Sequence, residues 1–282
     1  PALHDFVPLF LSGKHWDAKE FKSKGWSVRT LGAEMEEKDS WLQRLEEVKT
    51  LYQGGHTYYC KTDKFKEGLT PIAQERLDIM KSMMKELYSS SSLNLKAKYE
   101  EQDRIVERRP ADLEGFATYV DCLVKVRVAR DMLHDEFKQV ERMSYLLDYY
   151  GVDMLPTEKL LLTNLKKAKK KFERAMITAD GYEAAKKEGR KLEVKNNIKR
   201  INKQLKKMRE QLCSGPFVDS KQDPSDVVQE LEKVKESIDV LVKASEAANR
   251  HLQSFKVPQH KFGEIEKVTE LYLQKHRIWE NF

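Results

Sequence analysis

Five lysines within six consecutive residues are the densest charged cluster of the sequence. Ammonium groups at this density attract carboxylates and phosphates. Leu165, Ala168 and Phe172 continue an apolar helical stripe through the same segment, so the lysines must surround the helix. This turn is therefore predicted at the surface or the end of a helical bundle, as a candidate docking site. The lysines are Lys166, Lys167, Lys169, Lys170 and Lys171.

The basic character extends over residues 159–210, which carry 18 Lys and Arg against six Asp and Glu. This segment is strongly positive, although the whole chain has a net charge of only +6. One interpretation is a solvated helix face paired with acidic neighbours such as Glu230, Glu232 and Glu236. A second is a docking face for an acidic subunit, a calmodulin-like light chain or a tubulin surface. Nucleic acid is disfavoured, because no aromatic stacking platform accompanies the charge.

The sequence contains none of the common catalytic or nucleotide-binding motifs. A phosphate-binding G-x-x-x-x-G-K-[ST] loop, G-x-S-x-G and H-E-x-x-H are all missing. Cys60, Cys122 and Cys213 are far apart and odd in number, which is typical of a reducing compartment. His56 and Cys60 have helical spacing, but two ligands do not make a zinc site. We expect no active site, no cofactor and no metal in this chain.

Apolar residues recur with alternating steps of four and three along most of the chain, and they predict helices. Val227, Leu231, Val234, Ile238 and Leu241 form one such stripe. Each stripe must be buried against another helix, so the sequence predicts an all-α fold, an elongated array of antiparallel helical bundles with long amphipathic helices. Little or no sheet is expected. The predicted helices lie near residues 33–53, 70–88, 93–108, 111–149, 157–187, 190–213, 224–253 and 261–282.

Breaker residues set the predicted boundaries. Thr70-Pro71 is typical of a helix start, Ser89–Ser92 of a flexible connector, and Arg109-Pro110 of a helix end. Gly54-Gly55 is expected to end the first long helix. Gly189 leaves two alternatives open, because a glycine costs a helix only about 1 kcal/mol and one helix could run from 157 to 213.

These boundaries suggest three parts of the chain. Residues 1–32 are predicted to be irregular, with Trp16, Phe21 and Trp26 as packing anchors. Residues 33–109 are expected to form a short-helix bundle, and residues 110–282 one or more long-helix bundles.

No apolar run reaches the roughly 20 residues of a membrane span, and no signal peptide is recognised. The chain begins with Pro1 and stops inside a periodic segment, so we expect it to be part of a longer protein.

A structural turn is predicted between the last two long segments. Gly215 can adopt the left-handed conformation that ends a helix, and Pro216 prevents the helix from continuing. Asp223 or Ser225 would cap the next helix, with Pro224 in its first turn. The chain would reverse through about ten residues, which makes the flanking helices antiparallel neighbours.

The same turn carries a resemblance to a known family. Gly215-Pro216-Phe217, Pro224-Ser225-Asp226, Phe262-Gly263-Glu264-Ile265 and Leu271-Tyr272 resemble the tail of dynein heavy chains just before the linker. Further upstream, Arg109-Pro110 with Leu113 and Tyr119, and Tyr145-Leu146-Leu147-Asp148-Tyr149, are similar to two other segments of that tail. The resemblance covers residues 105–282. Asn249–Lys256 departs from the family's pattern, and the Trp expected after Pro156 is absent, so axonemal and intraflagellar-transport subclasses both stay open.

The resemblance implies a non-catalytic stem that joins a motor's linker and ATPase ring to accessory chains, cargo or a ciliary doublet. The implied partners are dynein intermediate, light or light-intermediate chains and neighbouring heavy chains. The implied location is the cytoplasm and cytoskeleton, with a cilium or flagellum axoneme preferred. The alternatives are a coiled-coil or spectrin-like scaffold, and a basic helical module that binds an acidic light chain. The spectrin-like alternative is weakened because the four Trp residues show no repeat of about 100 residues.

Overall fold

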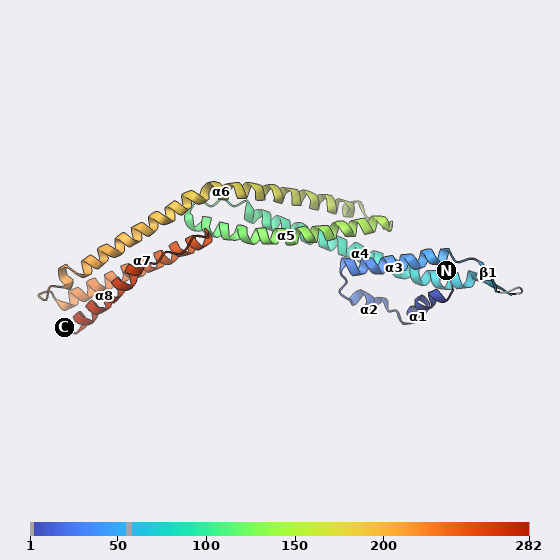
Figure 1. Cartoon of the computed structure of the whole chain (residues 1–282), viewed down its shortest axis with the longest axis horizontal. Coiled ribbons are helices and arrows are strands. Elements are labelled where there is room, and N and C mark those ends of the chain that lie inside the picture. The colour runs from blue at the N-terminus through green and yellow to red at the C-terminus, as the bar shows by residue number, and fades with distance from the viewer. Residues whose placement is uncertain (1–2, 55–57, 282) are drawn as a thin grey trace. The chain divides into compact units, whose positions relative to one another are not determined.

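The computed structural model describes residues 3–54 and 58–281 and confirms the predicted all-α fold (Figure 1). Long helices pack through buried apolar side chains, and the only sheet among the described residues is a short antiparallel pair of strands. The described elements are η1 (Leu3–Phe6), α1 (Val7–His15), α2 (Ala18–Ser23), α3 (Val28–Glu46), β1 (Leu51–Gly54), β2 (Tyr58–Lys61), α4 (Asp63–Val106), α5 (Leu113–Tyr149), α6 (Pro156–Leu212), η2 (Gly215–Phe217), α7 (Pro224–Ser254) and α8 (Gly263–Glu280).

The chain divides into two compact units that are built from separated segments. The first unit contains residues 1–102 and 129–173, and the second contains residues 103–128 and 174–282. Each of α4, α5 and α6 contributes residues to both units. The division predicted at residues 32 and 109 follows chain order and stays a prediction.

The core of the first unit is rich in aromatic side chains. The buried ring of Tyr99 lies 5.6 Å from the ring of Phe172, which joins α4 to α6. The Tyr99 hydroxyl donates to the Leu133 carbonyl of α5 at 3.2 Å, so its polar end is satisfied. Burial raises the pKa of Tyr99 to about 12. Three helices therefore meet at one side chain.

The N-terminal segment contains short helices rather than the predicted irregular chain. Its predicted anchors do pack together, because the buried Phe21 ring lies 5.8 Å from the Trp16 ring and 4.4 Å from the Trp26 ring. The indole of Trp26 donates to the Phe21 carbonyl at 2.6 Å. Asp17 caps α2 by accepting from the Lys19 amide. Local caps and aromatic contacts therefore order a segment that lacks helical periodicity.

The predicted helix over 33–53 is wrong at both ends. The capping box of Ser27 and Thr30 begins α3 earlier, at Val28. The helix stops at Glu46, well before Gly54-Gly55, and Leu51–Gly54 forms β1, paired with β2. The apolar spacing continued past the helix end because Val48 is buried in the loop that follows. Gly55 and His56 lie outside the described residues.

The two breaks predicted inside α4 are also wrong. This helix begins at Asp63 and includes Pro71, which lacks one amide donor but lies on the exposed side. Burial of Leu69 and Ala73 on the opposite side holds the helix through the proline. The serine run is helical as well, and the Ser90 and Ser92 hydroxyls donate to carbonyls of the preceding turn, which leaves neither hydroxyl unsatisfied. The predicted end at Arg109-Pro110 is close to the observed last residue, Val106.

The second unit is centred on apolar stripes of α6, α7 and α8, which lie side by side in Figure 1. Gly189 does not interrupt α6, so the single-helix alternative is correct, and its 57 residues extend over about 85 Å. Gly215 has the predicted left-handed conformation, with φ +61°, but α6 already ends at Leu212 and Gly215 begins η2. Asp223, rather than Ser225, caps α7 by accepting from the Ser225 amide at 2.8 Å.

The last helix holds this turn in place. Phe217 is buried beneath it, and its carbonyl accepts from the Trp279 indole of α8 at 3.3 Å.

None of the helices that the structure describes is both long enough and apolar enough to cross a membrane.

Candidate functional site

The five lysines of α6 do not form one surface. Lys169 is half-buried and directed toward α5, whereas the other four are exposed: Lys166, Lys167, Lys170 and Lys171. Leu165 and Phe172 are buried, so the predicted apolar stripe runs between the lysines. The turn therefore lies at the surface of the first unit, with one lysine directed inward.

Two of these lysines interact with α5. The Lys166 ammonium lies 3.5 Å from a carboxylate oxygen of Glu141. The Lys169 ammonium lies 3.2 Å from Nδ1 of His134 and 3.9 Å from the ring centroid of Phe137. By contrast, the structure gives Lys167 and Lys170 no ion pair within the described residues. These two ammonium groups are the strongest candidates for contact with a partner.

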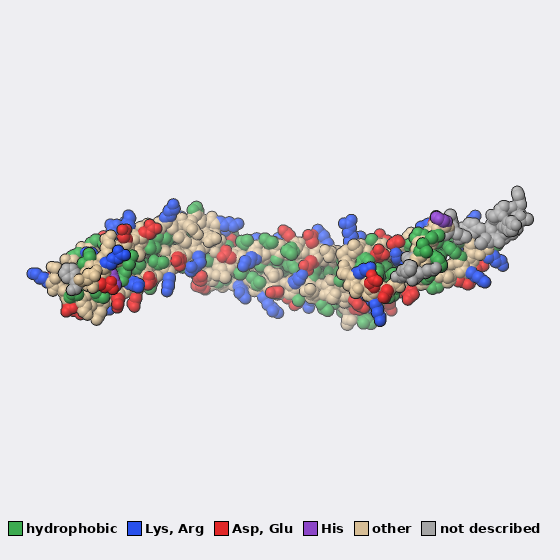
Figure 2. All heavy atoms as spheres, turned by 90° about the horizontal axis from the view of Figure 1, so that it is seen from below, with side chains coloured by type: hydrophobic (Ala, Val, Ile, Leu, Met, Phe, Trp, Pro, Cys, Tyr) green, Lys and Arg blue, Asp and Glu red, His purple; other side chains and the backbone are tan. Residues whose placement is uncertain are grey.

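The acidic residues of α7 that the sequence suggested as partners do not pair with the basic residues of α6. Within the described chain, no ion pair joins α6 to Glu230, Glu232 or Glu236 of α7. The basic residues of α6 instead pair with Glu141 of α5, with Glu264 of α8 and with acids of α6 itself. Figure 2 shows basic and acidic side chains interspersed on the viewed face, with hydrophobic ones between them.

A half-buried ionic cluster lies in the second unit. Arg127 of α5 donates to Asp180 at 2.7 Å and to Glu183 at 2.6 Å, both on α6. Glu183 is only 8% exposed and also accepts from Lys187 at 3.0 Å. Burial acts to raise the pKa of Glu183, but the hydrogen bonds from Arg127 and Lys187 outweigh it and lower the pKa. Glu183 therefore remains charged near neutral pH and clamps α5 to α6.

The Arg109-Pro110 motif has a structural role in the same unit. The Arg109 guanidinium donates to the Val106 carbonyl at 2.5 Å and to the Tyr119 hydroxyl at 3.0 Å, and it lies 5.2 Å from the Tyr182 ring centroid. The Tyr182 hydroxyl donates to the Pro110 carbonyl at 2.9 Å. These contacts satisfy the Val106 carbonyl at the end of α4 and fix the connection to α5.

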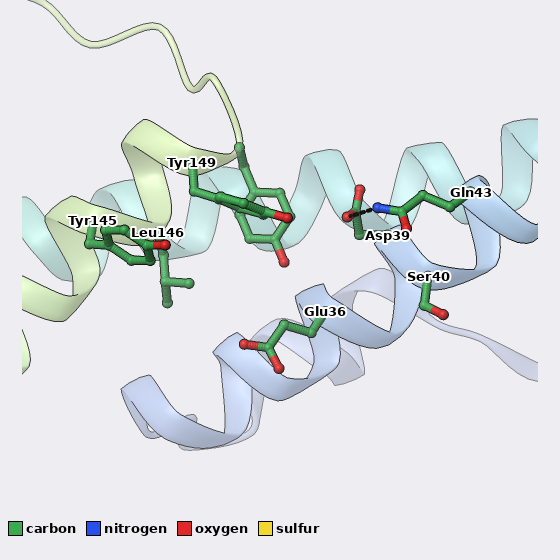
Figure 3. Close-up of a pocket in the computed structure, with 8 residues that line it drawn as sticks. Glu36, Asp39, Ser40, Gln43, Tyr145, Leu146 and Tyr149 are labelled. Atoms are coloured by element: carbon green, nitrogen blue, oxygen red, sulfur yellow. Dashed lines mark hydrogen bonds between the residues drawn. The ribbon is translucent and has the colours of Figure 1, made fainter.

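One pocket in the first unit combines aromatic rings with carboxylates (Figure 3). Tyr145 and Tyr149 project from the end of α5, and Glu36 and Asp39 lie opposite them on α3. The Tyr145 and Tyr149 rings are stacked, 6.3 Å apart, and Tyr150 meets Tyr149 edge-on at 5.0 Å. We call the cavity that these side chains line the tyrosine–acid pocket, after its five main residues: Tyr145, Tyr149, Tyr150, Glu36 and Asp39.

Sequence reasoning does not identify the tyrosine–acid pocket. In the sequence, Tyr145 and Tyr149 stand out only as part of a family motif, and nothing singles out Glu36 and Asp39. The available signal is the i, i+4 spacing of Tyr145 and Tyr149 and the i, i+3 spacing of Glu36 and Asp39, which puts each pair on one helix face. Nothing in the sequence says that these two faces meet.

The described residues offer little for metal or thiol chemistry. No group of three His, Cys, Asp or Glu within them is placed to hold a metal ion. Cys122 and Cys213 are both free thiols. For the His56–Cys60 pair, His56 and the side chain of Cys60 lie outside the described residues.

A scan against models of known protein families and a search of curated proteins found no match to this chain.

Proposed function

We propose that this chain is a non-catalytic structural segment of a dynein-like motor stem that docks an accessory chain. The motif resemblance over residues 105–282 supports the stem assignment. Long helices suit such a role. Their backbone hydrogen bonds are made within the helix, and packing against neighbouring helices stabilises them along their length. The docking assignment is carried by one observation, the pair Lys167 and Lys170 within the basic turn of α6.

The two lysines suit an acidic partner surface. They lie three residues apart, so their ammonium groups are neighbours on the helix. Neither charge is neutralised by an ion pair within the described residues, so both remain available to external carboxylates. The proposed partner is an accessory chain of the intermediate, light or light-intermediate class, bound through an acidic surface.

Charge reversal tests this proposal. The variant Lys167→Glu with Lys170→Glu should recover less accessory chain in a pull-down than the unmodified chain does. The difference should shrink as salt rises, because exposed charges more than about 8–10 Å apart are screened near physiological ionic strength. The matched control reverses two other exposed lysines of α6, Lys199 and Lys203, and should retain the partner. Equal recovery by both variants at low salt would mean that the basic turn is only a solvated face.

A further inference from the structure

The tyrosine–acid pocket is a cavity of about 330 Å³ formed by α3, the end of α5 and Tyr150. Its volume is at the lower end of the range of small-molecule sites. The side chains of Tyr145 and Tyr149 are 65% and 61% exposed, so large parts of their rings are open to solvent. Two exposed, stacked aromatic rings offer a flat electron-rich surface to a ligand.

The charge around these rings is negative. Glu36 has no hydrogen bond or ion pair within the described residues, and Asp39 accepts only from Gln43 of its own helix, at 2.9 Å. No Lys or Arg is found among the described residues that line the pocket. Burial is the main cause that raises the pKa of Tyr150 to about 12, and the charges of Asp39 and Glu36 add to it.

Two lysines of the first unit lie near this pocket, and each has an acidic partner elsewhere. The Lys81 ammonium of α4 lies 5.9 Å from the Tyr150 ring centroid and 4.0 Å from a carboxylate oxygen of Asp78. The adjacent Lys38 of α3 is buried and pairs with Glu34 and Glu37. Neither cation contacts Glu36, Asp39, Tyr145 or Tyr149 in the structure.

We propose that the tyrosine–acid pocket binds an arginine side chain presented by a basic segment of a partner protein. A guanidinium combines the two properties that the pocket requires. Its planar face stacks on aromatic rings, and its edge donates paired hydrogen bonds to carboxylates. A lysine ammonium lacks the planar face, and a neutral ligand would leave both carboxylates without a countercharge. This inference is independent of the basic turn of α6, which needs a partner of the opposite charge.

Binding is measured by NMR on the full chain labelled at its tyrosine rings. The probe is a short acetylated glycine-rich peptide that contains one arginine. Two further peptides replace the arginine by citrulline, its uncharged counterpart, or by lysine. The arginine peptide should shift the ring signals of Tyr145 and Tyr149 and should bind more tightly than either alternative. Equal binding of the citrulline peptide, or tighter binding of the lysine peptide, would overturn the assignment.

Substitutions distinguish the contribution of the aromatic ring to peptide affinity from that of the two carboxylates. Tyr149→Ala should weaken the arginine peptide roughly two- to fivefold, the usual contribution of an exposed cation–π contact, whereas Tyr149→Phe keeps the ring and the binding. Glu36→Gln with Asp39→Asn should weaken it by about the same factor or more. The control for charge is Glu67→Gln with Glu101→Gln, which removes two exposed carboxylates of α4 outside the pocket and should leave affinity unchanged. Unchanged affinity in Tyr149→Ala, or equal losses in both charge variants, would exclude the pocket as the binding site.

Discussion

Two glycines, one inside α6 and one just after it, illustrate how the same residue type has opposite effects on stability. Gly215 has φ +61°, a region that costs an L-residue roughly 1–2 kcal/mol. Gly189 is exposed in the interior of α6, where glycine is the weaker choice by about 1 kcal/mol relative to Ala. At both positions the space that a Cβ would occupy has no heavy atom within 4 Å, so steric clash does not decide the outcome.

The first prediction compares these two glycines. Gly215→Ala should lower the free energy of unfolding by about 1–2 kcal/mol, because the turn strains an alanine. Gly189→Ala should raise it by about 0.5–1 kcal/mol, because alanine loses less backbone entropy. Urea unfolding followed by circular dichroism measures both. A gain in stability from Gly215→Ala would show that the turn does not require the left-handed conformation.

The second prediction concerns Glu183 and Arg127. The pKa of Glu183 is lower in the folded chain than its ordinary value of 4.5, so its contribution to stability is present above that value and is lost as pH falls through the folded pKa. Arg127→Met should cost about 1–3 kcal/mol at neutral pH, because it leaves a buried carboxylate with fewer donors. The cost should be smaller once acid protonates Glu183.

Urea midpoints at neutral pH and near pH 3 (roughly one unit or more below the unfolded pKa of a glutamate) test this pH dependence. Lys125→Met removes a neighbouring exposed cation of α5 and serves as the control, with little effect at either pH. An Arg127→Met penalty that is independent of pH would assign the loss to packing rather than to charge.

At the scale of elements, helix α4 shows how burial overrides local breaker residues. The serine run from Ser89 to Ser92 lies between the buried Tyr88 and Leu95, and Ser92 itself is buried. Its hydroxyl donates to the Tyr88 carbonyl at 2.6 Å, so the side chain needs no water. Burial of one helix face supplies more free energy than the weak helix propensity of serine removes.

The third prediction tests the continuity of α4 at Ser90, which is exposed. Ser90→Pro should lower the free energy of unfolding by about 3 kcal/mol, because it removes an amide donor and clashes with the preceding turn. Ser90→Ala keeps the helix and should change it by less than about 0.5 kcal/mol. Urea unfolding distinguishes them. If both variants were equally stable, residues 89–92 would be the flexible connector that the sequence suggested.

In the chain as a whole, three long helices, α4, α5 and α6, each contribute residues to both compact units. Residues 103–128 belong to the second unit although they are flanked by residues of the first. Units of this kind arise because long helices extend beyond one local core. The boundary predicted at residue 109 lies in the connection between α4 and α5 and stays a prediction.

The far-ultraviolet circular dichroism of the full chain should be dominated by helix, because the only described sheet is the pairing of Leu51–Gly54 with Tyr58–Lys61. Raising the salt concentration should change it little, since the helices are held by buried apolar stripes rather than by exposed ion pairs. A spectrum with substantial sheet would contradict the fold.

The helical class, the apolar stripes and the left-handed conformation of Gly215 could all be predicted from the sequence. These features depend on periodicity and on backbone preferences, which neighbouring residues encode. The sequence patterns misplaced the boundaries of α3 and α4, because burial against distant segments decided whether Pro71 and the serines continue a helix. The shared pocket of Glu36 and Asp39 with Tyr145 and Tyr149 depends instead on how α3 lies against the end of α5. Their positions are more than a hundred residues apart, and no local pattern encodes which helix faces meet.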